Sequence, residues 1–130
     1  MITSRTILVG AALAGAASVA LGAFGAHALR AALDEQSLAT WRTAIDYAFW
    51  HALALLGAAA LARDGVTRTL AIAAGAFVVG IVLFSGSLCA LALGAPRALG
   101  IVTPFGGVAL IVGWLALAAH ALRSDGAPRA

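Results

Sequence analysis

The feature that most constrains this chain is the length of its uncharged segments. Four segments contain no Asp, Glu, Lys or Arg, at residues 6–29, 47–62, 69–96 and 98–122. A helix crosses the hydrocarbon core of a bilayer with about 20 residues. Three segments reach that length, and the second reaches it when its helix is extended backwards through Trp41. The sequence therefore predicts four membrane-spanning helices.

Composition excludes several other classes of protein. Apolar residues make up 63% of the 130 residues and charged residues 10%, more apolar surface than a small soluble domain can bury. The net charge of +3 comes from eight scattered arginines, too few for a nucleic-acid interface. The single cysteine, Cys89, excludes an intramolecular disulfide and a thiolate metal cluster. We expect one membrane domain in contact with lipid, with no nucleic-acid partner and no cofactor.

The predicted fold class is all-α, an antiparallel four-helix bundle with up-down-up-down topology. The expected helices cover about residues 6–27, 35–62, 69–94 and 104–122, and a flexible tail covers 124–130. Short connections force neighbouring helices to run antiparallel. One side of the membrane then receives five arginines, and the other receives Arg30, Arg42 and Arg97. Because cytoplasmic loops carry the excess of arginine, we expect both termini in the cytoplasm.

An alternative for the first helix is a cleaved secretory signal. Residues 26–28 (Ala-His-Ala) fit a small-x-small cleavage site, and Arg5 supplies a charged start. The apolar region of a signal is about 7–15 residues long, whereas the uncharged run from residue 6 to 26 is longer. The sequence therefore favours a helix that stays attached.

Small residues recur at helical spacing on two predicted helices. In lipid, helices associate through close backbone approach, which small residues allow. The first and third helices are therefore expected to pack through small faces. These faces are Ala14, Ser18, Gly22 and Ala26 on the first helix, and Gly86, Ala90 and Gly94 on the third.

Ionisable residues gather where the first helix ends and the second begins. An ionisable residue within a membrane is costly and is therefore a functional candidate. Arg42 and Asp46 are four residues apart and can pair on one helix face. The predicted polar cluster consists of His27, Arg42, Asp46, Tyr47 and His51.

Several interpretations of this cluster stay open. The plainest is a set of interface anchors, with His51 bonded to a backbone carbonyl. His27 and His51 could also ligate haem, or could bind another metal together with Asp46. A proton relay or a small polar pocket is a further alternative. His51 needs a partner from a facing helix, and His27, Ser85 and Ser87 are the expected ones. No base lies near the two serines, so a serine nucleophile is not supported.

Five short motifs in order resemble one bacterial family. They are residues 22–27 (GAFGAH), residues 43–44 with Tyr47 and residues 51–53, residues 84–88 (FSGSL), residues 103–107 (TPFGG) and residues 113–114 (GW). The chain is identified as a member of the small membrane family called domain-of-unknown-function family 423. The resemblance covers almost the whole chain, and it implies four helices and an inner-membrane location. It implies no established activity and no catalytic residue.

The sequence thus favours a non-enzymatic membrane protein with a structural or partner-binding role. The partner would be another membrane protein or further copies of the chain. The alternative is a small transporter or a proton- or cation-conducting module that uses the polar cluster. An enzyme is the third choice.

Overall fold

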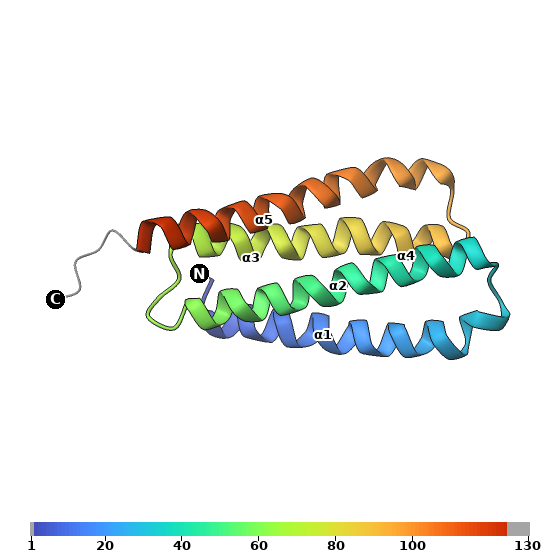
Figure 1. Ribbon diagram of the computed structural model, residues 1–130, viewed down its shortest axis with the longest axis horizontal. Helices are drawn as coiled ribbons and strands as arrows, with labels where there is room; N and C mark the ends of the chain where they lie inside the picture. The colour runs from blue at the N-terminus through green and yellow to red at the C-terminus, as the bar shows by residue number, and fades with distance from the viewer. Residues whose placement is uncertain (1, 125–130) are drawn as a thin grey trace.

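The computed structural model describes residues 2–124, which form helices joined by short connections (Figure 1). Four of its segments are long and apolar enough to cross a membrane. The prediction of an all-α fold with four spans is confirmed. Residues 125–130 of the predicted tail lie outside the described residues. The main helices are α1 (Ser4–His27), α2 (Glu35–Leu61), α3 (Arg68–Gly80), α4 (Gly86–Ala92) and α5 (Val102–Ser124).

Three short helical turns complete the described part of the chain. The turn η1 (Leu29–Ala31) follows α1, and η3 (Arg97–Ile101) leads directly into α5. Because η3 continues into α5, the last helix starts before residue 104, where the sequence predicts its start. A π-helical turn, η2 (Ile81–Ser85), joins α3 to α4, so these three elements form one span.

The four spans pack as an open row. Helix α1 packs along α2, α2 packs on the α3–η2–α4 span, and α5 packs along the other side of that span. Figure 1 shows this order, with α1 and α5 as the outer members. In the most apolar part of each span, 50% of the residues of α2 are buried but only 17% of those of α1 and of α5. Much of each outer helix therefore faces the surroundings.

Side chains with hydroxyl or carboxylate oxygens begin three of the helices. Thr3 forms a capping box with Thr6 at the start of α1. The carboxylate of Asp34 accepts a hydrogen bond of 2.7 Å from the backbone N–H of Ser37, as expected for an N-cap. Thr67 accepts from the backbone N–H of Leu70 at the start of α3. These bonds satisfy N–H groups that have no partner within a helix.

The small face of α1 is rotated relative to the prediction. Residues four apart drift by about 40° per step around a helix of 3.6 residues per turn. Ser18 of the expected stripe is buried, but Ala26 at its end is exposed and Gly25 is buried instead. A Cβ on Gly25 would lie 2.5 Å from Nε1 of Trp41. Gly25 therefore lets the Trp41 ring of α2 lie against α1, where its indole donates to the carbonyl of Leu21.

The second predicted small stripe begins directly after the π-helical turn. One extra residue in a helix rotates everything that follows by about 100°. Gly86 is exposed and has open space where a Cβ would lie, whereas Ser85 and Ser87 on either side are buried. Sequence spacing alone does not reveal such a turn.

Gly94 ends α4, although it was expected to pack against a helix. Its φ of +94° lies in the left-handed region, which glycine adopts without steric penalty. The N–H of Gly94 donates to the carbonyl of Leu91, and that of Ala95 donates to the carbonyl of Ala90. This pair of bonds is the Schellman motif that commonly ends helices.

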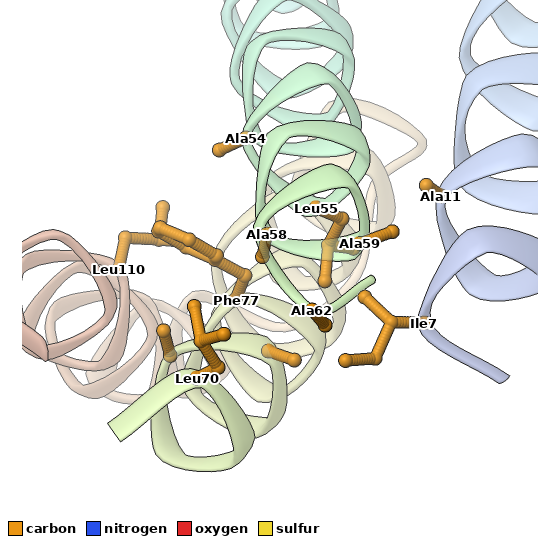
Figure 2. Packing of buried hydrophobic residues seen from close by; sticks show 12 residues of the cluster. Ile7, Ala11, Ala54, Leu55, Ala58, Ala59, Ala62, Leu70, Phe77 and Leu110 are labelled. Atoms are coloured by element: carbon orange, nitrogen blue, oxygen red, sulfur yellow. The ribbon is translucent and has the colours of Figure 1, made fainter. Parts of the chain in front are cut away.

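The main apolar core lies toward the end of the molecule where α2 turns into α3. Figure 2 shows Phe77 of α3 beside Leu110 of α5, and Ile7 of α1 near Ala62. Phe77, Leu55 and Leu70 are the largest side chains that are fully buried. A smaller cluster of Leu29, Trp41, Ile45 and Ala92 lies toward the other end. The region between the two clusters contains the buried histidine described next.

Candidate functional site

His51 is a buried polar residue in the middle of α2. Its side chain is 5% exposed, and its Nδ1 lies 2.7 Å from the backbone carbonyl of Tyr47, one turn earlier. A carbonyl oxygen can only accept, so the hydrogen of this bond belongs to Nδ1. The interpretation that His51 is bonded to a backbone carbonyl is confirmed.

The second ring nitrogen of His51 is bonded to another helix. Nε1 of Trp114 in α5 donates to Nε2 of His51 at 3.2 Å. An indole N–H is only a donor, so Nε2 must be the acceptor. The neutral ring with its hydrogen on Nδ1 makes both bonds together. The pair links α2 directly to α5, two helices that otherwise pack mainly against the α3–η2–α4 span.

Aromatic rings surround this pair. The His51 ring centroid lies 5.6 Å from that of Phe77 and 6.1 Å from that of Trp114. The Tyr47 ring stacks on His51 at 6.0 Å and approaches Phe84 at 4.7 Å. These separations are typical of favourable aromatic pairs. His51 is therefore held in a largely apolar enclosure built by α2, α3, η2 and α5.

Two glycines of α5 make room for this enclosure. A Cβ on Gly113 would lie 2.5 Å from Cε1 of Phe77. A Cβ on Gly106 would collide with the backbone of Phe84 in the π-helical turn. Gly106 lies in the family motif at residues 103–107, and the structure places it in close contact with the backbone of Phe84.

The five residues of the predicted polar cluster do not form one group. Tyr47 and His51 contact each other, whereas Arg42 and Asp46 line a separate groove of about 270 Å³ beside α1. His27 is exposed at the end of α1. Among the described residues, no ion pair joins Arg42 to Asp46.

The prediction of a partner for His51 was correct about its position on a facing helix and wrong about which residue it is. It comes from a facing helix, but it is Trp114 rather than His27, Ser85 or Ser87. The physical reason is that α1 does not face His51. It packs on the side of α2 that carries Trp41 and Ile45. The sequence did contain a signal for Trp114. Tryptophan usually lies at the membrane interface, but Trp114 lies near the middle of the span Arg97–Arg123, where its N–H is far from water. An indole at that depth needs an acceptor.

The two serines near the π-helical turn differ in their bonding. Ser87 donates to the carbonyl of Phe84 at 3.0 Å and lies 2.7 Å from the hydroxyl of Thr103 in α5. The buried Oγ of Ser85 has no hydrogen-bond partner among the described residues. Ser87 therefore links two helices, as hydroxyls in membranes commonly do.

The sequence left open whether these side chains could ligate a metal ion or haem. The described residues contain no group of three or more His, Cys, Asp or Glu side chains that could hold a metal ion. Ligation of haem by His51 through Nε2 would require breaking its bond with Trp114. The arrangement is suited to joining helices.

Comparison with known proteins decides the family. The family model described as "Protein of unknown function (DUF423)" matches residues 21–107. The chain belongs to this family. His51, Tyr47 and Phe77 lie within the matched residues, and Trp114 lies beyond them. The resemblance inferred from the sequence motifs is confirmed.

Relatives in this family are described as bacterial membrane proteins. The chain is 39% identical over 121 residues to the UPF0382 inner membrane protein YgdD of Escherichia coli, covering 93% of the chain and 92% of the relative. It is 40% identical over 108 residues to the UPF0382 membrane protein YwdK of Bacillus subtilis, covering 82% and 87%. No solved structure matches the chain. The chain is a small multi-pass membrane protein, and these relatives indicate no specific activity.

Proposed function

We propose that this chain is a non-enzymatic protein of the inner membrane, with both termini in the cytoplasm, that binds another membrane protein through its outer helices. The observation that carries the proposal is the contrast between α2 and the outer helices. The apolar part of α2 is 50% buried, but that of α5 is 17% buried. An outer helix with so little burial has most of its surface free for a neighbour.

The exposed face of α5 supports this role. Large apolar side chains recur on it at spacings of three and four residues, which places them on one side of the helix. They are Phe105, Val108, Val112 and Leu115 of α5 with Ile101 at the end of η3, exposed by between 43% and 69%. Lipid can cover such a face, but so can a helix of another protein, through van der Waals packing.

The bonding of His51 supports a structural role for the polar centre. Both ring nitrogens have partners within the chain. A residue that relays protons must exchange them with water or with another titratable group. Of the rings around His51, Phe77 and Trp114 do not titrate, and Tyr47 bonds to His51 through its backbone carbonyl and not through its hydroxyl. We therefore assign His51 to holding α2 against α5.

Photo-crosslinking in native membranes tests the proposal. A photoreactive amino acid at Val108 would lie on the exposed face of α5, and the same residue at Leu110, which is 3% exposed, provides the buried control. We expect the Val108 variant, expressed from its own chromosomal locus, to give one protein adduct of defined mass that the Leu110 variant does not give. Lipid adducts alone at Val108, with the chain purified free of other proteins, would contradict the proposal.

The alternative function is proton or cation conduction. It rests on Arg42 and Asp46, which line one groove beside α1. Purified protein in liposomes, with a pH-sensitive dye inside, distinguishes the two. Our proposal predicts the same dye response as in protein-free liposomes, for wild type and Asp46→Asn alike. A flux that Asp46→Asn abolishes without a change in melting temperature, from a chain that purifies as a bare homo-oligomer, would favour conduction.

A further inference from the structure

Two adjoining cavities form a groove along one side of the α1–α2 pair. At the end of the molecule near the α2–α3 turn, a cavity of about 360 Å³ is lined by Arg5, Leu8, Leu56 and Arg63 together with small residues. A second cavity of about 260 Å³ adjoins it, because Leu8 and Leu56 line both. The second cavity extends to Gly15 and Phe49 and is lined entirely by apolar residues. The groove is therefore charged at one end and apolar along the rest.

The charge at the mouth of the groove has one sign. Arg5 and Arg63 are its ionisable lining residues, and no carboxylate lines either cavity. Both arginines are exposed. Guanidinium groups bind phosphate with paired, geometrically matched hydrogen bonds. The mouth of the groove thus matches a phosphate group.

The position and length of the groove match one leaflet of a bilayer. Arg5 and Arg63 lie at the ends of their spans, which is where lipid headgroups lie, whichever way the protein faces. From Arg5 to Gly15 along α1 is about 15 Å at 1.5 Å per residue, and the hydrocarbon core is about 30 Å thick. The apolar part of the groove therefore has the reach of an acyl chain.

We propose that this groove binds one phospholipid with a net negative headgroup. Its phosphate lies between Arg5 and Arg63, and one acyl chain lies along Leu8 toward Gly15 and Phe49. A zwitterionic lipid carries a cationic group that these arginines repel, so the site prefers anionic lipid. This inference stands independently of the function proposed above.

Native mass spectrometry of the purified protein with defined lipids tests the headgroup contacts. The probes are phosphatidylglycerol, phosphatidylcholine with the same acyl chains, and glycerol phosphate. We expect one phosphatidylglycerol per chain, bound more tightly than phosphatidylcholine, and no stable binding of glycerol phosphate. Arg5→Gln with Arg63→Gln should weaken phosphatidylglycerol binding at least about tenfold, since each arginine contributes to anionic-lipid attraction. The control is Arg68→Gln, because Arg68 lies near the same end of the molecule and does not line the groove.

A matched glycine pair tests the acyl-chain part of the groove. A Cβ at Gly15 or at Gly10 meets nothing within 4 Å, so at either position a side chain can leave the backbone without a clash. Gly15 lines the proposed groove, and Gly10 lines a different one, between α1 and α3. Gly15→Leu should weaken phosphatidylglycerol binding, and Gly10→Leu should leave it unchanged.

Several results would overturn the proposal. They are equal binding of phosphatidylcholine and phosphatidylglycerol, unchanged binding by the double arginine variant, and equal losses in Gly15→Leu and Gly10→Leu. A lipid-free dimer that closes the groove would also overturn it. If the double arginine variant does not fold, as judged by its melting temperature, Gly15→Leu and the comparison of the two lipids decide alone.

Discussion

At the scale of single residues, the hydrogen bond between Trp114 and His51 is the main contact that the sequence did not predict. Trp114→Phe keeps an aromatic ring but removes the N–H, which leaves Nε2 of His51 without its donor in an apolar enclosure. We expect this change to lower the free energy of unfolding by roughly 1 kcal/mol, as for hydrogen bonds between membrane helices. Unfolding in mixed micelles, followed by circular dichroism, measures it.

The control for this prediction is Trp50→Phe. Trp50 is exposed to a similar extent, 53% against 51% for Trp114, and its indole makes no hydrogen bond among the described residues. Trp50→Phe should leave stability nearly unchanged. Equal losses for the two variants would mean that the His51 bond adds nothing beyond the general effect of removing an indole.

The sequence predicts which residue types matter more readily than which of them meet. That His51 needs a partner from another helix follows from the cost of a buried polar group. That the partner is Trp114 depends on the order of the helices in the row, which places α5 across from His51 and α1 on another side of α2. Hydrophobicity and spacing within one helix carry no information about that order.

At the scale of elements, the contact between the π-helical turn and α5 sets how closely two spans approach. Gly106→Ala would place a methyl group against the backbone of Phe84, which cannot move aside as a side chain can. We expect a loss of about 1–3 kcal/mol, as for overpacking in a core, measured as the free energy of unfolding in mixed micelles.

The neighbouring glycine provides the matched control. A Cβ on Gly107 would lie 3.8 Å from the Phe84 ring, an ordinary contact. Gly107→Ala should therefore be tolerated. If both alanine variants are equally stable, the close approach of α5 to the π-helical turn is not as the structure describes it.

The stability of the first turn of α2 should depend on pH. Hydrogen bonds from Ser37, first from its backbone and then from its side chain, hold the pKa of Asp34 below its ordinary value of 3.8. A carboxyl whose pKa is lowered by folding stabilises the folded state above its unfolded pKa. It loses that effect as the pH falls through the folded pKa. We expect amide-exchange protection in the first turn of α2 to fall at acidic pH.

Asp34→Asn separates titration from capping. Asparagine is also a good N-cap but does not titrate in this range, so protection in this variant should not change between neutral and acidic pH. A fall in protection as large as that of the wild type would show that another group causes the pH dependence.

The boundaries and caps of the helices follow largely from the sequence, and the packing faces follow less. Asp34 is recognisable as a cap from its type and position. The face of α1 drifts because Gly25 rather than Ala26 accommodates Trp41, and the face of α4 shifts because of the π-helical turn. The first difference arises from a contact with another helix, and the second follows a local change in the helical hydrogen bonding of the same span. Periodicity along one regular helix includes neither.

At the scale of the whole molecule, the four spans place charges at two ends. The turn between α2 and α3 contains Arg63 and Arg68, and the connection between α1 and α2 contains Arg30 and Asp34. The bias of arginine predicts the first end in the cytoplasm. The predicted up-down arrangement places these two ends on opposite sides of the membrane, and the arginine bias predicts which end is cytoplasmic.

Cysteine accessibility in intact cells tests the orientation most directly. Cys89 is first replaced by alanine to remove the one native thiol, and single cysteines are then introduced at Gln36 and at Asp64, which are both exposed. With a membrane-impermeant maleimide, we expect Gln36→Cys to be labelled in cells whose outer membrane alone has been permeabilised. Asp64→Cys should be labelled only after the inner membrane is permeabilised. Labelling of Asp64→Cys while the inner membrane is still closed, with Gln36→Cys protected, would contradict the predicted topology.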